Sequence, residues 1–264
     1  MKTLAFDFGA SSGRAILSKF DGDKISLHEI HRFSNDPVMF TGTLYWDVLR
    51  LMNEMKTALI CCKQEGHGDL KSVASDTWGV DFGLLDKNGS LISNPVHYRD
   101  TRTDGMQEEA AKIIPDRAFY ESTGIQFMKL NTVYQLMSMG RTQPELLELA
   151  DKLLFMPDLF NYYLTGEKLC EYSIASTSQM MDARKKDWDR ALLQKLGINV
   201  GLLGDIVPSG TLAGSLSKQM CQGTGLKDVQ VIAVGGHDTA SAVLAVPAMK
   251  EHFAYISSGT WSLL

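Results

Sequence analysis

Short runs of small residues, of a kind that can bind phosphate, come directly after apolar, strand-like stretches. The first is DFGASSGR at residues 7–14. Its glycines and serines let backbone N–H groups and hydroxyls approach phosphate oxygens, and Asp7 at the strand end can hold Mg²⁺ through water. The alternative interpretation is an ordinary glycine-rich turn, and this segment alone does not decide between the two.

This segment matches neither of the common nucleotide-binding loops. It lies between two strand-like runs, and it has neither the GxxxxGK(S/T) pattern nor the GxGxxG pattern. The DFG tripeptide also occurs in protein kinases. Because no HRD-type catalytic loop precedes it here, we interpret that match as accidental.

A carboxylate follows a second apolar run, in the segment GGHDTASA at residues 235–242. Asp238 there is either the N-cap of the small-residue helix that it opens or a catalytic carboxylate facing a cleft. The two preceding glycines favour the catalytic interpretation, because they allow a ligand near the backbone and a cap does not need them.

A third segment, SSGT at residues 257–260, repeats the pattern of the first: a strand end, small hydroxylated residues and glycine. Two such loops in one chain suggest that each of two related domains supplies one loop and that the domains close on ATP between them.

Three other features predict structure rather than chemistry. The pair His28 and His31 lacks the four-residue helical spacing of a zinc site. Trp78 has no basic patch around it, so we interpret it as a pocket wall or core residue rather than a stacking platform. The four cysteines show no CxxC spacing, which favours structural thiols in a reducing compartment.

The elements that must position these segments follow from periodicity. Alternating or apolar runs predict strands at residues 3–8, 14–20, 25–33, 72–77 and 80–86, the first three antiparallel. Apolar residues from Val48 to Cys62 recur at helical spacing and predict a core-packing helix that ends near Gly66. Further helices are expected at 103–113, 130–139, 144–150, 158–164 and 189–196, and strands at 153–156, 229–234 and 254–257. The mixture predicts an α/β domain with a helical insertion.

Composition excludes several classes of protein. The 264 residues are 44% hydrophobic and 22% charged, as in soluble globular proteins, and no apolar run approaches the roughly 18 residues of a membrane span. No export signal is visible, so we expect a cytoplasmic protein with no membrane partner. The net charge of −5 argues against a nucleic-acid partner.

The three segments together resemble a known family. Residues 7–14 and 257–260 are similar to the two phosphate loops of the superfamily that unites sugar kinases, actin and Hsp70-type ATPases, and residues 235–242 to the catalytic segment of the FGGY carbohydrate kinases. Five further motifs resemble the members of that family that act on L-rhamnulose: DTWGVDF at 76–82, YRD at 98–100, GIQF at 124–127, MPD at 156–158 and SGTWSL at 258–263.

The resemblance implies a fold and a domain division. The fold is an RNase H-like, actin-like ATPase domain with a mixed sheet and a helical insertion. Residues 1–246 would form the N-terminal sugar-binding domain, and residues 247–264 the first strand of a truncated C-terminal ATP-binding domain. We therefore expect that about half the enzyme is missing and that this chain is inactive alone.

The resemblance also implies a reaction and its site. The γ-phosphoryl group of ATP passes to the C1 hydroxyl of a ketose, L-rhamnulose, with Mg²⁺ and loop amides neutralising phosphate charge and Asp238 as general base. Asp7 would lie near Mg²⁺. The implied ATP-binding residues are Ala10, Ser11, Ser12, Gly13, Arg14, Gly259 and Thr260. The implied substrate-binding residues are Gly79, His237, Asp238 and Thr239, with Asp81 and Arg99 as further candidates for sugar hydroxyls.

Two alternatives remain open. One is another kinase of the same family, acting on xylulose, fuculose or glycerol. The other is a non-catalytic ATP-binding member of the superfamily, against which a carboxylate in a sugar-sized pocket argues.

Overall fold

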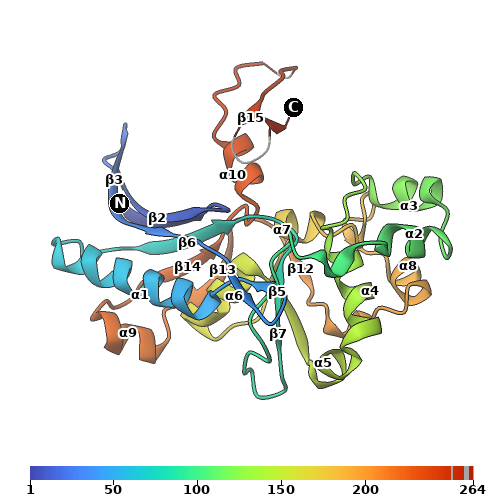
Figure 1. The fold of residues 1–264 in the computed structure, drawn as a ribbon. Coiled ribbons are helices and arrows are strands. Elements are labelled where there is room, and N and C mark those ends of the chain that lie inside the picture. Colours follow the sequence, from blue (N-terminus) through green and yellow to red (C-terminus); the bar gives the residue numbers. More distant parts are fainter. Residues whose placement is uncertain (251, 259–261, 264) are drawn as a thin grey trace.

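Six strands form one sheet, and a largely helical body lies to one side of it (Figure 1). The computed structural model describes residues 1–250, 252–258 and 262–263. From edge to edge the strands are β13 (Thr211–Ser215), β14 (Gln230–Ala233), β6 (Ser72–Thr77), β1 (Lys2–Phe8), β2 (Ser12–Phe20) and β3 (Ile25–Ser34). β14, β6 and β1 are parallel, whereas β2, β3 and β13 each run antiparallel to a neighbour. The predicted mixed sheet and its three antiparallel strands are confirmed.

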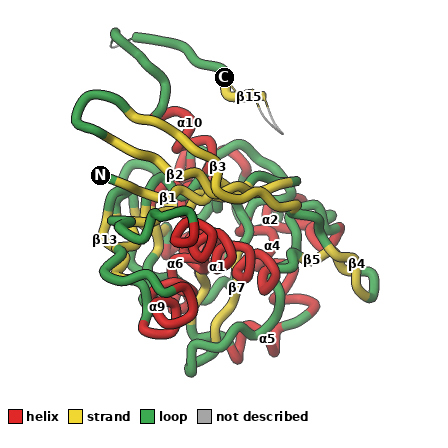
Figure 2. The backbone as a smooth tube through the Cα atoms, turned by 90° about the vertical axis from the view of Figure 1, so that its left-hand side faces the viewer, coloured by secondary structure: helices red, strands yellow, loops and turns green. Residues whose placement is uncertain are grey.

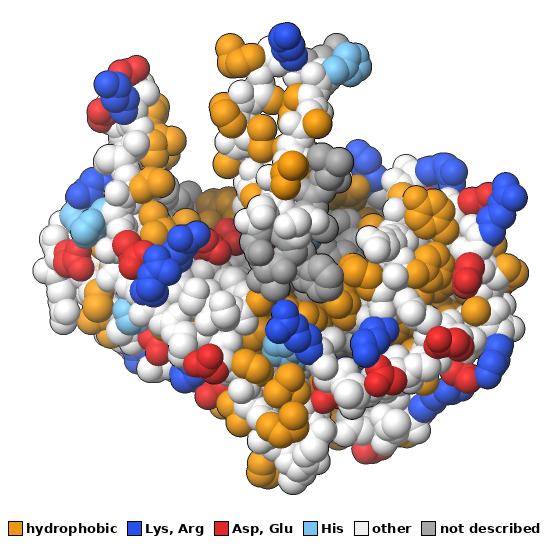
Figure 3. Space-filling model, turned by 45° about the horizontal axis from the view of Figure 1, so that its top comes forward, with side chains coloured by type: hydrophobic (Ala, Val, Ile, Leu, Met, Phe, Trp, Pro, Cys, Tyr) orange, Lys and Arg blue, Asp and Glu red, His pale blue; other side chains and the backbone are white. Residues whose placement is uncertain are grey.

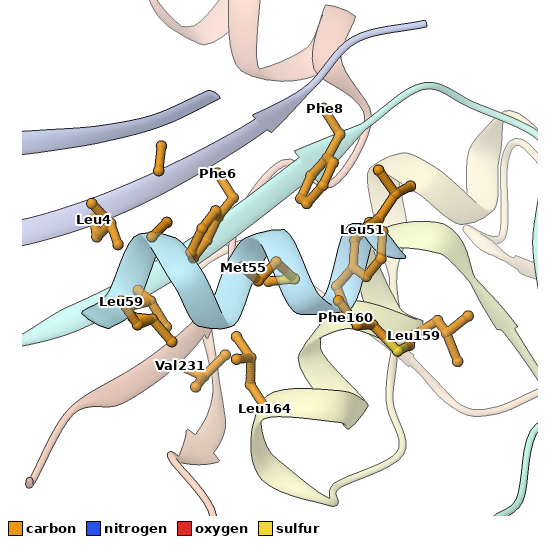
Figure 4. Close-up of a cluster of buried hydrophobic side chains, with 14 of the residues drawn as sticks. Leu4, Phe6, Phe8, Leu51, Met55, Leu59, Leu159, Phe160, Leu164 and Val231 are labelled. Atoms are coloured by element: carbon orange, nitrogen blue, oxygen red, sulfur yellow. The ribbon is translucent and has the colours of Figure 1, made fainter. Parts of the chain in front are cut away.

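The main core lies between one face of the sheet and two helices, α1 (Val48–Gln64) and α6 (Met156–Thr165). Leu4, Phe6 and Phe8 alternate along β1 and point to this face, where they meet side chains of both helices (Figure 4). Full burial of each such side chain stabilises the fold by about 1.5–3 kcal/mol. The seven apolar residues predicted to form one face of α1 are all buried.

The helical body has a core of its own. Its helices lie on the side of the molecule away from β3, with α7 next to the sheet and the others beyond it (Figure 1). They are α2 (Met106–Ala111), α3 (Asp116–Thr123), α4 (Thr132–Thr142), α5 (Pro144–Leu149), α7 (Tyr172–Ser176) and α8 (Arg190–Lys195). The antiparallel pair of β7 (Phe82–Leu85) and β8 (Lys152–Phe155) places side chains in both cores. The predicted helical insertion is therefore present, joined to the sheet through this strand pair.

The remaining elements are short. A hairpin of β4 (Val38–Phe40) and β5 (Thr43–Tyr45) projects from the body (Figure 2). The others are β9 (Cys170–Glu171), β10 (Met181–Asp182), β11 (Asp187–Trp188), β12 (Ile206–Val207), α9 (Lys218–Thr224), α10 (Asp238–Leu244), β15 (Ser257–Ser258), β16 (Ser262–Leu263) and two 3₁₀ turns at Thr101–Thr103 and Val200–Leu202. No helix in the part of the chain that the structure describes is both long and apolar enough to span a bilayer.

Three predicted boundaries are wrong. The helix expected at 103–113 is a 3₁₀ turn followed by α2, because Gly105 adopts a left-handed conformation with φ +80°. The strand expected at 80–86 begins only at Phe82, since Val80 has φ +68°. The strand expected at 254–257 is displaced: residues 254–256 have no regular structure and β15 starts at Ser257.

The end of α10 and the segment after it project away from the sheet and carry exposed apolar side chains (Figure 3). They are Leu244, Met249, Phe253 and Ile256. The predicted phosphate-loop residues Gly259 and Thr260 lie outside the described residues, so their assignment stays a prediction. The domain boundary at residue 246 also stays a prediction.

Candidate functional site

The candidate site lies at one edge of the sheet, where the three parallel strands end. β1 ends at Phe8, β6 at Thr77 and β14 at Ala233. The Thr77 N–H donates to the Gly236 carbonyl over 2.8 Å and Thr77 bridges to His237, so the chain leaving β14 lies beside the end of β6. Ligands of open α/β sheets bind outside such carboxyl ends. The structure therefore brings the first predicted loop and the Asp238 segment to one edge.

The first loop is a tight turn between β1 and β2. The Gly9 N–H donates to the Ser12 carbonyl over 2.9 Å, and the buried Asn35 holds the turn from the side. The Asn35 side-chain amide donates to the Gly9 carbonyl at 2.8 Å, and its backbone N–H donates to the Ser11 carbonyl at 3.0 Å. The Ser11 and Ser12 side chains stay exposed, as a phosphate-binding role requires. Sequence patterns gave no signal for Asn35.

Gly13 has a packing reason to be glycine. A Cβ at this position would lie 2.3 Å from the Phe33 ring, which is buried against Phe8 in the core. Substitution of Gly13 would therefore disturb the sheet as well as any phosphate contact. A larger residue at position 13 cannot distinguish the phosphate loop from an ordinary turn.

Asp7 and Arg14 form an ion pair across β1 and β2. They face each other in the strand register, and the Arg14 Nη2 lies 2.7 Å from the Asp7 Oδ2. Both side chains are partly exposed on the sheet face opposite the core. The pair holds the Asp7 carboxylate near the end of β1 and the Arg14 guanidinium near the start of β2, on either side of the turn.

Asp76 lies directly beside Asp7, in register on the parallel strand β6. No donor in the described part of the chain reaches its carboxyl. Burial, together with the charges of Asp7 and Asp238, raises the pKa of Asp76 from 3.8 to about 8. Asp76 opens the DTWGVDF motif, but the sequence carries no signal for its role, because its partners are distant in the sequence.

The acidic edge fits a water-mediated Mg²⁺ ion. Within residues 1–250, 252–258 and 262–263, no three His, Cys, Asp or Glu side chains form a set that could hold a metal ion. Mg²⁺ usually keeps several waters and takes one or two carboxylates together with substrate phosphates. The adjacent carboxyls of Asp7 and Asp76, whose mutual repulsion a cation would relieve, suit that mode.

Replacing Asp76 with asparagine is expected to stabilise the fold at pH 8. Since the folded-state pKa lies above the ordinary value, the folded protein binds more protons than the unfolded one between about pH 4 and 8, and stability falls as the pH rises through that window. Removing the charge should recover about 0.5–2 kcal/mol at pH 8 and less at pH 5. Urea unfolding at both pH values measures this. A loss of stability at pH 8 would contradict the assigned crowding of negative charge.

Asp238 is the first residue of α10, and His237 occupies the N-cap position without a side-chain cap bond. The Asp238 Oδ1 accepts from the Thr239 N–H at 2.6 Å and from the Thr239 hydroxyl at 3.1 Å. The other oxygen has no donor among the residues that the structure describes, and the side chain is 41% exposed. The simple N-cap interpretation is therefore excluded. A fixed carboxylate with one free oxygen is suited to accept a proton.

His237 lies against this carboxylate, with its Nε2 3.4 Å from the Asp238 Oδ1. Burial lowers the pKa of His237 below its usual value of 6.5, against the opposing effect of Asp238. The ring is therefore predominantly neutral at pH 7. It can donate a hydrogen bond to a bound hydroxyl or accept one from it.

Packing inside the protein also favours glycine at the two positions before His237. A Cβ on Gly236 would lie 2.9 Å from the Pro157 Cγ, and one on Gly235 would lie 3.3 Å from the Ser241 hydroxyl. These glycines therefore do more than leave room for a ligand, because they also let the loop between β14 and α10 pack against Pro157 and Ser241.

Gly79 begins a strained turn. The Asp81 N–H donates to the Gly79 carbonyl at 2.9 Å around Val80, whose φ of +68° is rare for a β-branched residue. The Thr177 hydroxyl accepts from the Val80 N–H at 3.0 Å, and the Thr132 hydroxyl donates to the Val80 carbonyl at 2.7 Å. Such strain persists only where neighbours impose it, and it clusters at ligand-binding sites.

Asp81 lies inside the protein, not in a pocket. Its side chain is fully buried, and its two oxygens accept from four donors. These are the Trp46 Nε1 at 2.6 Å, the Trp78 Nε1 at 3.1 Å, the Tyr98 N–H at 3.1 Å and the Gln135 Nε2 at 2.9 Å. Burial raises the pKa of Asp81 to about 6. The expected contact with a sugar hydroxyl is therefore corrected: the structure gives Asp81 the geometry of a residue that joins four chain segments.

An aromatic cluster surrounds this carboxylate. Trp46 stacks on Trp78 with ring centroids 3.9 Å apart and on His97 at 4.0 Å. Burial lowers the pKa of His97 to about 4, and its Nδ1 accepts from the Arg99 N–H. Trp78 is a core residue, one of the two roles predicted for it. The Arg99 guanidinium is exposed and lies 5.4 Å from the centre of the Tyr98 ring, so Arg99 stays available to a ligand.

The four cysteines are free thiols, two of them buried. Burial raises the pKa of Cys62 to about 11 and that of Cys170 well above its usual range. These two thiols are thus poor nucleophiles at neutral pH, in agreement with the predicted structural role.

Comparison with known proteins identifies the class. Residues 2–245 match the N-terminal domain of the FGGY family of carbohydrate kinases, and the chain belongs to this family. Among solved structures, xylulose kinase from Lactobacillus acidophilus superposes with a TM-score of 0.82 at 15% identity, over 92% of this chain and 49% of that one. Glycerol kinase from Plasmodium falciparum has a TM-score of 0.77 at 14% identity, over 88% and 48%. The actin-like ATPase fold is thereby confirmed.

Curated relatives are more specific. The chain is 42% identical over 261 residues to rhamnulokinase from Oceanobacillus iheyensis and 43% identical over 261 residues to rhamnulokinase from Bacteroides thetaiotaomicron. The matches cover 99% of this chain but 55% and 54% of those proteins. The chain thus spans about half the length of the curated relatives it matches, and the similarity to rhamnulokinases extends along nearly all of it.

Proposed function

We propose that this chain carries the sugar-binding and catalytic-base part of an ATP-dependent rhamnulokinase. The observation that carries the proposal is Asp238, a carboxylate with one anchored and one free oxygen at the edge where β1, β6 and β14 end. The similarity of the chain to rhamnulokinases, at 41–43% identity over 99% of its length, supports the choice of L-rhamnulose as substrate.

The proposed reaction transfers the γ-phosphoryl group of ATP to the C1 hydroxyl of L-rhamnulose. The free oxygen of Asp238 accepts the hydroxyl proton as the substrate oxygen attacks phosphorus in line. Four residues position the sugar hydroxyls: Gly79, Arg99, Thr239 and His237, the last with a neutral ring. The phosphates lie along residues 10–14.

Mg²⁺ is the cofactor that this chemistry calls for, held through water by Asp7 with Asp76 beside it. When bound, it neutralises negative charge on the phosphates. Use of ATP together with four free thiols supports a cytoplasmic location.

A ketose panel tests the proposal. With active enzyme, ATP and coupled detection of ADP, we expect the highest kcat/KM with L-rhamnulose and a product phosphorylated at C1. Faster turnover of xylulose, fuculose or glycerol would move the chain to another branch of the family. Binding of ATP without transfer to any of these acceptors would support a non-catalytic role instead.

A further inference from the structure

We propose that residues 171–177, which comprise α7 and the residue on either side, clamp the Gly79 turn and the Asp238 loop at once, with Glu171 and Thr177 as positioning residues. Helix α7 lies where the sheet meets the helical body (Figure 1). The inference rests on the proposed sugar kinase function, in which Gly79 and Asp238 face one substrate.

The N-terminal end of the clamp holds the Asp238 loop. Glu171 is 1% exposed and caps α7, accepting from the N–H groups of Ser173 at 2.9 Å and Ile174 at 3.1 Å. The same carboxylate accepts from the Gly236 N–H at 3.0 Å, and the Ser173 hydroxyl accepts from the His237 N–H at 3.3 Å. Two successive amides just before Asp238 are therefore bound to one end of α7.

Close packing prevents the loop from sliding along this end. A Cβ on Gly236 would lie 2.9 Å from Pro157 and 3.1 Å from the Glu171 Oε2. The Ser209 hydroxyl also donates to the Glu171 carboxylate, which fixes the side chain from a third direction. Hydrogen bonds to a buried carboxylate are stronger than those between neutral groups.

The C-terminal end of the clamp holds the Gly79 turn. The Thr177 hydroxyl donates to the Ile174 carbonyl at 2.7 Å and accepts from the Val80 N–H at 3.0 Å. The Thr177 side chain also closes on the turn, since a Cβ on Gly79 would lie 3.2 Å from its methyl group. Val80 therefore keeps its left-handed conformation partly through a hydrogen bond to α7.

A single helical turn between the two ends makes their positions interdependent. Because α7 has five residues and is bound at both ends, a shift of the Gly79 turn requires a shift of the Gly236–His237 backbone. The clamp thus sets the spacing between the sugar pocket and the catalytic carboxylate.

Thr177→Val and Glu171→Gln test the clamp, and Thr224→Val is a matched control. The Thr224 hydroxyl likewise donates to a carbonyl of its own helix, that of Met220, and accepts from a backbone N–H, that of Leu226. It lies far from the site. Amide hydrogen exchange is the first readout. Thr177→Val should speed exchange about tenfold at Val80 and also at Gly236 and His237 across the clamp, whereas Thr177→Ser, which keeps the hydroxyl, should restore wild-type rates.

Steady-state kinetics of the active enzyme, as in the ketose panel, is the second readout. Thr177→Val should raise the KM for the sugar about tenfold, Glu171→Gln should lower kcat about tenfold, and the KM for ATP should change less than about twofold in both. Faster exchange at Val80 alone, or changes no larger than those of Thr224→Val, would overturn the clamp. If exchange responds as expected but no ketose is phosphorylated by the wild-type enzyme, the clamp stands and the proposed function fails.

Discussion

The substitution Asp238→Asn is expected to lower kcat by about 10²–10⁴-fold while leaving sugar and ATP binding nearly unchanged. The amide oxygen can still accept from the Thr239 N–H and hydroxyl, so the loop keeps its anchor. What is lost is a basic oxygen for the substrate proton. Coupled ADP release measures kcat, and calorimetry with each ligand measures binding.

Asp116→Asn is the matched control for this substitution. Asp116 is likewise the first residue of a helix, α3, but it is exposed in the helical body. Its replacement removes a similar helix-terminal charge and should leave kcat within about twofold. A near-normal kcat for Asp238→Asn would remove Asp238 from the role of general base.

The substitution Asp81→Ala is expected to lower the free energy of unfolding by about 3–5 kcal/mol. The substitution leaves the indole N–H groups of Trp46 and Trp78, the Tyr98 N–H and the Gln135 amide without their buried acceptor. Each unsatisfied buried donor is costly, and the aromatic stack that they hold would loosen. Urea or guanidinium unfolding gives the change directly.

Two further variants separate this role from substrate contact. Asp81→Asn keeps one acceptor oxygen and should cost less than alanine. Asp151→Ala removes a surface carboxylate, 3.4 Å from the Lys168 Nζ, and should cost less than about 1 kcal/mol. Unchanged stability of Asp81→Ala with a large rise in the KM for the sugar would restore the sugar contact that the geometry argues against.

Local patterns in the sequence were sufficient for the elements whose neighbours are close in the chain. The β1–β2–β3 hairpins follow from alternating residues and an Asp-Gly turn, and the buried face of α1 follows from helical spacing. The patterns did not predict α3, α9 or β13. β13 contains a register shift at Gly214, and α9 has few apolar residues, so neither carries a clear period.

The motifs also identified the first loop and Asp238, because glycines, hydroxyls and a carboxylate in a short segment are visible without a fold. They could not tell what each glycine serves. Gly13 is fitted to Phe33 and Gly236 to Pro157, contacts that span 20 and 79 positions of the chain. Close approach of a ligand and close packing of a side chain both favour glycine, so the sequence alone does not distinguish between them.

The sequence by itself thus determined the family, most of the local elements and the segments for which we propose chemistry. Only the tertiary structure decided which acidic residues share the site. It placed Asp76 beside Asp7 through parallel pairing, took Asp81 out of the pocket into the core, and joined Glu171 to Gly236 across 65 positions. The physical reason is that burial and charge proximity, which set the role of a carboxylate, arise from contacts between distant segments and have no local period to predict them.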